Sequence, residues 1–149
     1  MEIKIALPAD QESIAALMDR SIRELQESYL SKIQVEASFD IMGLDTQLID
    51  DGTYYVVEDR GQLVGCGGDA ARIRAMYTDP DHARRGIGRL IPETCEAAAR
   101  AEGFGRAELV ATLSGEPLYS ACGYGVVEEN VADTPSGIAI PVRHMAKDL

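Results

Sequence analysis

The stretch of sequence that decides the fold is Arg72-Ile-Arg-Ala-Met-Tyr-Thr-Asp-Pro-Asp-His-Ala-Arg-Arg-Gly-Ile-Gly-Arg-Leu-Ile91. Its first part, residues 72–78, contains apolar side chains and no breaker, which predicts a strand. The following Asp79-Pro80-Asp81 ends that strand, because proline fixes φ and cannot donate to a sheet ladder. Apolar residues then recur with the spacing of one helix face, at Ile87, Leu90, Ile91, Cys95 and Ala98. We therefore expect a strand, a turn and the start of a helix.

Two glycines, Gly86 and Gly88, fall at the N-terminus of this predicted helix. The first amides of a helix lack intrahelical acceptors and lie at the positive end of its dipole, so they favour an anion. Glycine has no Cβ to hold a ligand away from the backbone, so the amides of Gly86, Ile87 and Gly88 are expected to be accessible to an anion. The cations around this point are Arg84, Arg85 and Arg89. The pattern predicts a phosphate or pyrophosphate site, with a tight turn beside a solvated arginine face as the alternative.

Two other phosphate-binding loops do not fit the sequence. A P-loop requires Gly-x-x-x-x-Gly-Lys followed by Ser or Thr, and the chain contains no such run. A dinucleotide fingerprint requires a third glycine, and Gly86-Ile-Gly-Arg-Leu-Ile lacks it.

The length and composition indicate one domain, residues 1–149, with enough apolar sequence (46%) to bury a core. Asp and Glu number 25 against 14 Lys and Arg, which gives a net charge of −11. Such a surface repels polyanions, so we expect no nucleic-acid partner and a weak bias toward cationic ligands such as amines.

The three cysteines, Cys66, Cys95 and Cys122, are far apart and form no Cys-x-x-Cys pair. We interpret them as buried thiols in a reducing compartment and expect no disulfide and no metal site. The N-terminus shows no signal-peptide pattern, and no run is long and apolar enough for a membrane span. These features predict a soluble cytoplasmic protein without a membrane partner.

The N-terminal half predicts a strand, a helical region and a hairpin. Alternation in Glu2-Ile-Lys-Ile-Ala-Leu predicts the strand, and Asp10 is the expected N-cap of a helix. The apolar face of that helix comprises Ile14, Leu17, Met18 and Ile22. Residues 25–44 are compatible with a second helix or with a helix and a loop, ending near Gly43. Two runs rich in β-formers, residues 53–58 and 62–67, are expected to pair as a hairpin.

The C-terminal half begins with the long helix, expected from Gly86 to Ala101, in which Pro92 should bend the helix or open its first turns. Residues 106–111 then predict a strand parallel to the strand at 72–78, because the helix between them forms a right-handed crossover. A short helix from Glu116 to Cys122 and two closing strands, residues 124–129 and 137–145, complete the chain.

The central motif resembles a known family. Ala83-Arg-Arg-Gly-Ile-Gly, preceded by Met76-Tyr-Thr-Asp-Pro, is similar to motif A of the GNAT superfamily of acyl-CoA N-acyltransferases, in which Arg or Gln-x-x-Gly-x-Gly or Ala binds the pyrophosphate of acetyl-CoA. The family's Arg or Gln position is Ala83 here, so Arg84 and Arg85 are left to supply the charge. The connection Gly67–Ala71 is also shorter than the resemblance implies, through a trimmed loop or omitted residues.

A second element, Leu118-Tyr119-Ser-Ala-Cys-Gly-Tyr124, resembles the family's aromatic motif. The resemblance implies that Tyr119 is the general acid for the CoA thiolate, with packing of its ring as the structural alternative. It also implies a pantetheine contact at Ser114, for which turn capping is equally compatible. Backbone amides of Met76, Tyr77 or Thr78, exposed by a splay between strands, would polarise the thioester carbonyl.

The acceptor side is less defined. The resemblance makes Tyr29 and Phe39 candidates for shaping an acceptor pocket, although packing is favoured for both. The carboxylates considered as a general base are Glu58, Asp69 and Glu108, and the two lone histidines, His82 and His144, carry no assigned role. Direct attack by the amine is implied, so no cysteine nucleophile is required.

The resemblance implies an α/β (α+β) fold with a mixed, mostly antiparallel sheet of six or seven strands and about four helices. The expected activity is transfer of an acetyl group from acetyl-CoA to a primary amine, of a small molecule in preference to a protein, and a homodimer is compatible with the family. One alternative is a CoA-binding sensor with little turnover. A nucleotide-phosphate binding domain unrelated to CoA is the other.

Overall fold

The computed structural model describes residues 1–82 and 86–149, so Ala83 and the predicted anion-site cations Arg84 and Arg85 lie outside the described residues. The strands are β1 (Glu2–Ile5), β2 (Tyr54–Asp59), β3 (Gln62–Gly68), β4 (Arg72–Thr78), β5 (Arg106–Thr112), β6 (Gly125–Asp133) and β7 (Ala139–Asp148). The α-helices are α1 (Gln11–Gln26), α2 (Lys32–Ser38), α3 (Thr46–Asp50), α4 (Ile87–Ala101) and α5 (Glu116–Ala121), and 3₁₀ turns cover Pro8–Asp10 and Pro80–His82.

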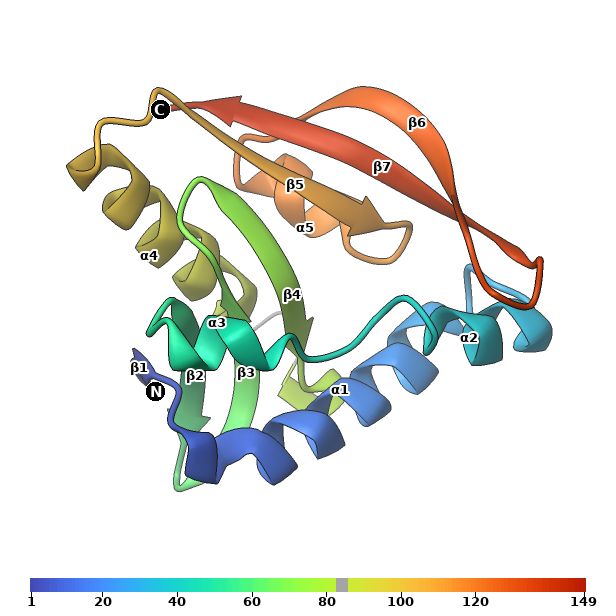
Figure 1. The fold of residues 1–149 in the computed structure, drawn as a ribbon, viewed down its shortest axis with the longest axis horizontal. Coiled ribbons are helices and arrows are strands. Elements are labelled where there is room, and N and C mark those ends of the chain that lie inside the picture. Colours follow the sequence, from blue (N-terminus) through green and yellow to red (C-terminus); the bar gives the residue numbers. More distant parts are fainter. Residues whose placement is uncertain (83–85) are drawn as a thin grey trace.

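The seven strands form one sheet in the order β1-β2-β3-β4-β5-β7-β6. Neighbouring strands are antiparallel except for β4 and β5, which are parallel and are joined through α4. Figure 1 shows β4 and β5 starting side by side and diverging toward their C-terminal ends. The predicted mixed, mostly antiparallel sheet and its parallel crossover are therefore confirmed.

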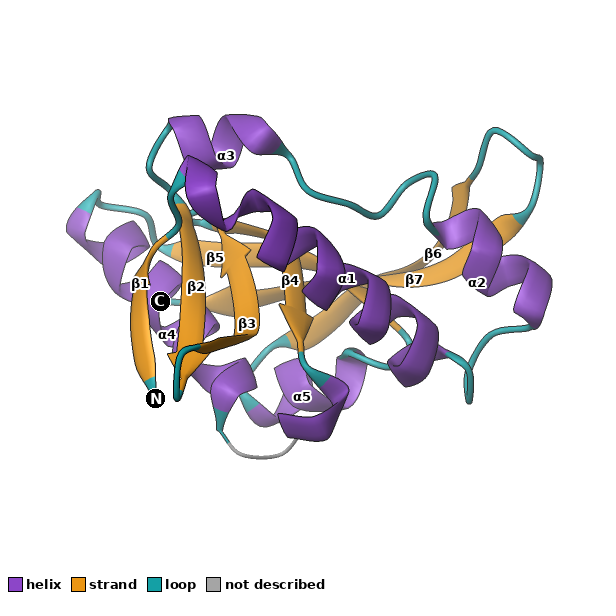
Figure 2. Cartoon of the chain, turned by 90° about the horizontal axis from the view of Figure 1, so that it is seen from below, coloured by secondary structure: helices purple, strands orange, loops and turns teal. Residues whose placement is uncertain are grey.

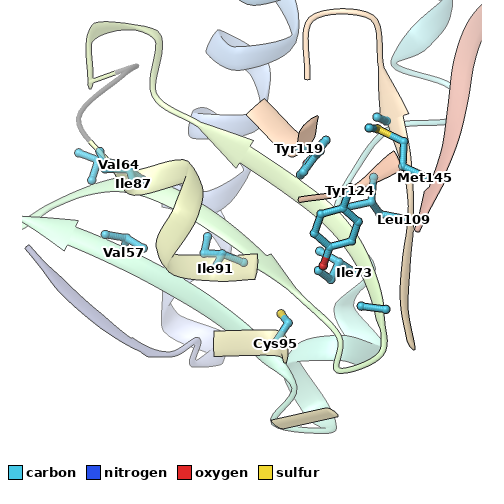
Figure 3. Close-up of a cluster of buried hydrophobic side chains, with 12 residues drawn as sticks. Val57, Val64, Ile73, Ile87, Ile91, Cys95, Leu109, Tyr119, Tyr124 and Met145 are labelled. Atoms are coloured by element: carbon cyan, nitrogen blue, oxygen red, sulfur yellow. The ribbon is translucent and has the colours of Figure 1, made fainter. Parts of the chain in front are cut away.

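Helices cover both faces of the first four strands, with α1 and α3 on one face and α4 on the other (Figure 2). On the α4 face, Ile87, Ile91 and Cys95 pack against residues of β2 to β5, as Figure 3 shows. On the other face, Ile14, Leu17 and Met18 of α1 pack against residues of β2 and β3. Each helix is held to the sheet by its apolar stripe, which for α1 is the stripe predicted from the sequence.

Several predicted boundaries agree with the structure, and the central strand has the predicted limits, Arg72–Thr78. Of the two alternatives left open for residues 25–44, a second helix or a helix and a loop, the structure has the helix and loop, and α2 ends at Ser38, before Gly43. Asp10 occupies the N-cap position of α1 without capping it, because its carboxylate accepts the Leu7 amide at 2.8 Å within the preceding 3₁₀ turn. That local bond competes with the cap.

Two further differences concern α4. Ala99, rather than the predicted Ala98, is the fully buried residue of the last turns, consistent with a helix period of 3.6. Pro92 lies buried inside α4, which is helical from Ile87 to Ala101, so the first turns are not opened as one of the two predicted effects required. Burial of the proline ring offsets the lost bond to the Gly88 carbonyl. None of the described helices has the length and apolar character needed to cross a membrane.

Candidate acyl-transfer site

The site is built around the point where β4 and β5 separate. The two strands are in register only at Arg72 with Glu108 and Ile73 with Leu109, and beyond these pairs β4 continues without β5. On its other side β4 remains paired with β3, where the Asp79 amide donates to the Val64 carbonyl at 2.8 Å.

Along a strand, successive backbone amides point alternately to its two neighbours. Because the Asp79 amide bonds to β3, the directions of the preceding amides of β4 follow from it. The Tyr77 amide points toward β3, whereas the amides of Met76 and Thr78 point into the space left by β5. Of the three residues expected to expose amides there, Met76 and Thr78 have the required direction and Tyr77 does not. The predicted splay is therefore present, with its donors two residues apart.

A β-bulge includes the first of these donors, Met76. Gly68 pairs with Arg74 and Cys66 with Tyr77, so Ala75 and Met76 together face Gly67. Ala75 has φ of 50°, which is uncommon for a residue with a side chain. The buried Tyr54 hydroxyl donates to the Ala75 carbonyl and holds the bulge from β2.

The start of α4 places its first amides next to the C-terminal end of β4. Gly86 has φ of 83°, and a Cβ there would meet no atom within 4 Å among the described residues, so backbone conformation is what requires glycine. Access of a ligand to the backbone, the reason predicted for Gly88, is not the full reason for a glycine at this position. Its Cβ would lie 2.5 Å from Leu118 Cδ2, so Gly88 also permits α4 and α5 to pack closely.

A cavity of about 610 Å³, called here the α4 cavity, opens at this helix start. Sequence-predicted residues that line it are Met76, Tyr77, Thr78, Gly86, Gly88, Arg89, Ser114 and Tyr119. The side chain of Ile87 instead enters the core and is 1% exposed, so only its backbone could serve a ligand. Tyr29, half exposed, also lines the α4 cavity.

A second cavity of about 650 Å³, called here the β4–β5 cavity, is lined by the two diverging strands, by β7 and by the loop between α2 and α3. The two cavities share four residues, Met76, Tyr77, Thr112 and Tyr119. Thr112 was not singled out from the sequence as a site residue. Its position at the end of the strand that follows the crossover helix is the signal that could have identified it.

Tyr119 lies on α5 and is 8% exposed. Its ring packs edge-on against Tyr124, with 6.2 Å between ring centroids. The alternative in which its hydroxyl bonds a backbone carbonyl is not seen, since no partner for that hydroxyl is found in residues 1–82 and 86–149. Burial raises the pKa of the phenol, with smaller contributions from Tyr77 and Cys122, so the group stays protonated at neutral pH.

The hydroxyls of Thr112 and Ser114 lie 3.0 Å apart in the turn after β5. The Thr112 hydroxyl also accepts the Gly115 amide at 3.2 Å. Thr112 thus caps the turn, which was the role considered for Ser114, and the Ser114 side chain remains on the wall of the α4 cavity.

The turn after β4 is anchored by Asp79, which is 1% exposed. Its carboxylate accepts the Asp81 amide at 2.9 Å and the Arg20 guanidinium at 3.0 Å. Burial of the carboxyl would raise its pKa, but these two donors outweigh burial and lower it. His82, considered a solvated turn residue, is largely buried between Asp79 and Asp59, at 3.8 and 3.9 Å.

The remaining candidate residues differ in whether they line one of the two cavities. Phe39 lines neither cavity and packs below the guanidinium of Arg23, 4.6 Å from its ring centroid, in agreement with the packing interpretation. Among the base candidates, Glu58 pairs with Lys4 at 2.8 Å on the outer strands, and Asp69 lines neither cavity. Glu108 lines the β4–β5 cavity, as does His144.

All three cysteines are free thiols. Burial raises the pKa of both the Cys66 and the Cys95 thiols to about 12, and it also raises the pKa of Cys122. A thiol with a raised pKa is a poor nucleophile at neutral pH. The geometry thus favours a site that works without a cysteine nucleophile.

Comparison with protein families and solved structures identifies proteins that are similar to this chain. The family described as "Acetyltransferase (GNAT) domain" matches residues 50–126. The fold resembles a GCN5-related N-acetyltransferase from Rhodopseudomonas palustris (TM-score 0.87, 23% identity, 99% of this chain and 95% of that chain). It also resembles a phosphinothricin acetyltransferase from Sinorhizobium meliloti in complex with AcCoA (TM-score 0.69, 20% identity, 99% and 88%).

A third similar structure is the PaiA N-acetyltransferase from Thermoplasma acidophilum in complex with coenzyme A (TM-score 0.68, 14% identity, 99% and 98%). At these identities the structural likeness establishes the fold alone. Comparison with curated protein sequences gave no match. The match to the family covers more than half of the chain, from the end of α3 to the start of β6, and includes the whole β4–turn–α4 motif. The chain belongs to the GNAT acetyltransferase family.

Proposed function

We propose that residues 1–149 form a single catalytic domain that transfers the acetyl group of acetyl-CoA to a primary amine, of a small molecule in preference to a protein. The observation that carries this proposal is the meeting of two cavities at Met76, Tyr77, Thr112 and Tyr119. One cavity contains the anion-binding helix start, and the other is open to a second substrate. Two reactants could thus meet at Tyr119.

The residues of the α4 cavity fit acetyl-CoA. The amides at Gly86 to Gly88 and the Arg89 side chain would hold its pyrophosphate, because they combine a helix N-terminus with a cation. The Ser114 hydroxyl and the amides of Met76 and Thr78 would contact the pantetheine arm and the thioester carbonyl. Acetyl-CoA supplies an acetyl group activated as a thioester.

The acceptor nitrogen forms the new C–N bond to the thioester carbonyl carbon while the C–S bond breaks and its electron pair goes to sulfur. We assign Tyr119 as the acid that gives its hydroxyl proton to that sulfur. The proton lost by the amine would reach Glu108 by a relay through His144, whose Nε2 is 3.7 Å from the Glu108 carboxylate, because Glu108 lies level with Arg72 at the far end of the cavity from Met76. Glu108 is preferred because it is the one base candidate that lines the β4–β5 cavity.

The experiment is thiol release from acetyl-CoA with polyamines, amino acids, aminoglycosides and peptides with free N-termini as acceptors. Calorimetric titration with acetyl-CoA runs in parallel. Turnover with one class of amine supports the proposal and identifies the acceptor. Tight binding without turnover across the panel would favour a CoA-binding sensor, and competition by ATP as strong as that by CoA would favour a general nucleotide site.

A further inference from the structure

The β4–β5 cavity contains charged side chains on two of its walls. Arg72 and Arg74 lie two residues apart on β4, so their side chains share one face of the sheet, and both line the cavity. Glu108 on β5 and His144 on β7 line it from the neighbouring strands. Much of the remaining lining is apolar, so these charges decide which acceptors are admitted.

The acidic groups of this cavity already have cationic partners. The Glu108 carboxylate lies 3.3 Å from Arg106 Nε, and the Asp45 carboxylate lies 3.7 Å from Arg74 Nη2. Arg72, in contrast, makes no ion pair with any described residue, although Glu108 is its register partner across the parallel pair. The unpaired charge of the cavity is therefore positive.

The position of this charge along β4 sets its distance from the reacting centre. The Met76 amide faces the opening between β4 and β5, and Arg74 and Arg72 lie two and four residues before it. A strand rises about 3.3 Å per residue, and the bulge at Ala75 and Met76 removes one residue of that rise, so the two arginines lie roughly 3 and 10 Å from Met76 along the strand. A group held by Arg72 would thus be at the opposite end of the acceptor from its amine.

Building on the proposed function, we propose that the acceptor is an elongated primary amine that carries a terminal carboxylate, which Arg72 binds with support from Arg74. A guanidinium matches a carboxylate through two parallel hydrogen bonds. Arg74 contributes less because Asp45 and Asp69 share its charge, at 3.7 and 3.9 Å. The chain's net charge of −11 does not prevent this, because salt screens distant exposed charges beyond about 8 Å.

The test uses amines of matched length whose far end is a methyl group, an ammonium group or a carboxylate. The short set is butylamine, putrescine and γ-aminobutyrate, and the long set is hexylamine, hexamethylenediamine and ε-aminocaproate. We expect kcat/KM for ε-aminocaproate to exceed that for hexylamine by about tenfold or more, with hexamethylenediamine lowest. The advantage should be smaller in the short set, because its carboxylate stops short of Arg72.

Substitution at Arg72 tests the assignment. Arg72→Gln should reduce the preference for ε-aminocaproate over hexylamine to about one, whereas Arg72→Lys should keep part of it and Arg74→Gln should lower it less. The matched control is Arg60→Gln, an exposed arginine between β2 and β3 that lines neither cavity, and it should leave the preference unchanged.

Thermal shift of the CoA-bound protein with the same six amines separates this inference from the proposed function. One outcome is that no amine is acetylated but ε-aminocaproate stabilises the wild-type protein and not the Arg72→Gln variant. The proposed acetyl transfer would then be refuted, while binding of an amine with a terminal carboxylate would be supported. Equal or greater turnover with the methyl or ammonium series overturns the inference while the transferase remains. Absence of any carboxylate preference in both turnover and thermal shift also overturns it.

Discussion

The hydroxyl of Tyr54 on β2 donates a 2.5 Å hydrogen bond to the backbone carbonyl of Ala75 on β4. Tyr54 is fully buried, and Ala75 is the β-bulge residue with positive φ. The bond reaches across β3 to the strand that borders both cavities, so a core side chain fixes the backbone that aims the Met76 and Thr78 amides.

Replacing Tyr54 by Phe should destabilise the fold by about 1–3 kcal/mol, because the partly buried Ala75 carbonyl loses its donor. The turnover rate should fall as well, since the bulge positions the amides of the site. The matched control is Tyr55→Phe, because no hydrogen bond of the Tyr55 hydroxyl is found in the described part of the chain. Urea unfolding and thiol release provide the two measurements, and equal effects of the two variants would contradict the assignment.

Replacing Tyr119 by Phe should lower kcat on the order of 10²-fold while the dissociation constant of acetyl-CoA changes little. Because burial raises the pKa of this phenol, wild-type activity should not decline from its ionisation anywhere near neutral pH. The comparison variant is Tyr124→Phe. The Tyr124 hydroxyl donates to Glu96 at 3.1 Å, so its removal should lower stability more than the turnover rate. An unchanged kcat, or loss of acetyl-CoA binding alone, would refute the acid role of Tyr119.

Replacing Gly88 by Ala should destabilise the protein by about 1–3 kcal/mol, because the new methyl group would meet Leu118. Leu118→Ala should relieve much of that cost, which a double-mutant cycle in urea measures. Gly86→Ala should cost about 1–2 kcal/mol through its positive φ, and Leu118→Ala should not relieve it. Additive behaviour of the Gly88 and Leu118 substitutions would count against close helix packing as the role of Gly88.

The Asp79–Arg20 ion pair predicts a dependence of stability on pH. The folded-state pKa of Asp79 is lowered, so its stabilisation is present above the unfolded-state value, about 3.9, and is lost as pH falls through the folded value. Asp79→Asn should therefore cost about 1–3 kcal/mol at neutral pH and progressively less in acid. Asp19→Asn, in the exposed pair with Arg23, should cost under about 0.5 kcal/mol. Urea unfolding at several pH values tests both, and a cost at Asp79 that persists in strong acid would exclude ionisation as its source.

Much of the architecture could be predicted from local sequence. The limits of β4, the N-terminus of α4 and the buried face of α1 follow from breakers, glycines and periodicity, which act within a few residues. The α3 helix was not predicted, because its five residues are too few to show a period, although the Asp45 carboxylate caps it at 3.0 Å from the Gln47 amide. Pro92 is buried inside α4 by packing between elements, which the sequence near the proline does not reveal.

The sequence by itself determined the order of the elements, the helix start that suits a phosphate, and Tyr119 as a candidate acid. Only the tertiary structure decided which amides face the opening, because the bulge at Ala75 depends on Gly67 and Tyr54 from other strands. The charge of the β4–β5 cavity was likewise decided there, because Asp45, from the segment before α3, pairs with Arg74, while Arg72 is left unpaired among the described residues. The physical reason is range: propensity and periodicity act between near neighbours, whereas bulges, ion pairs and cavities form between residues that the fold brings together.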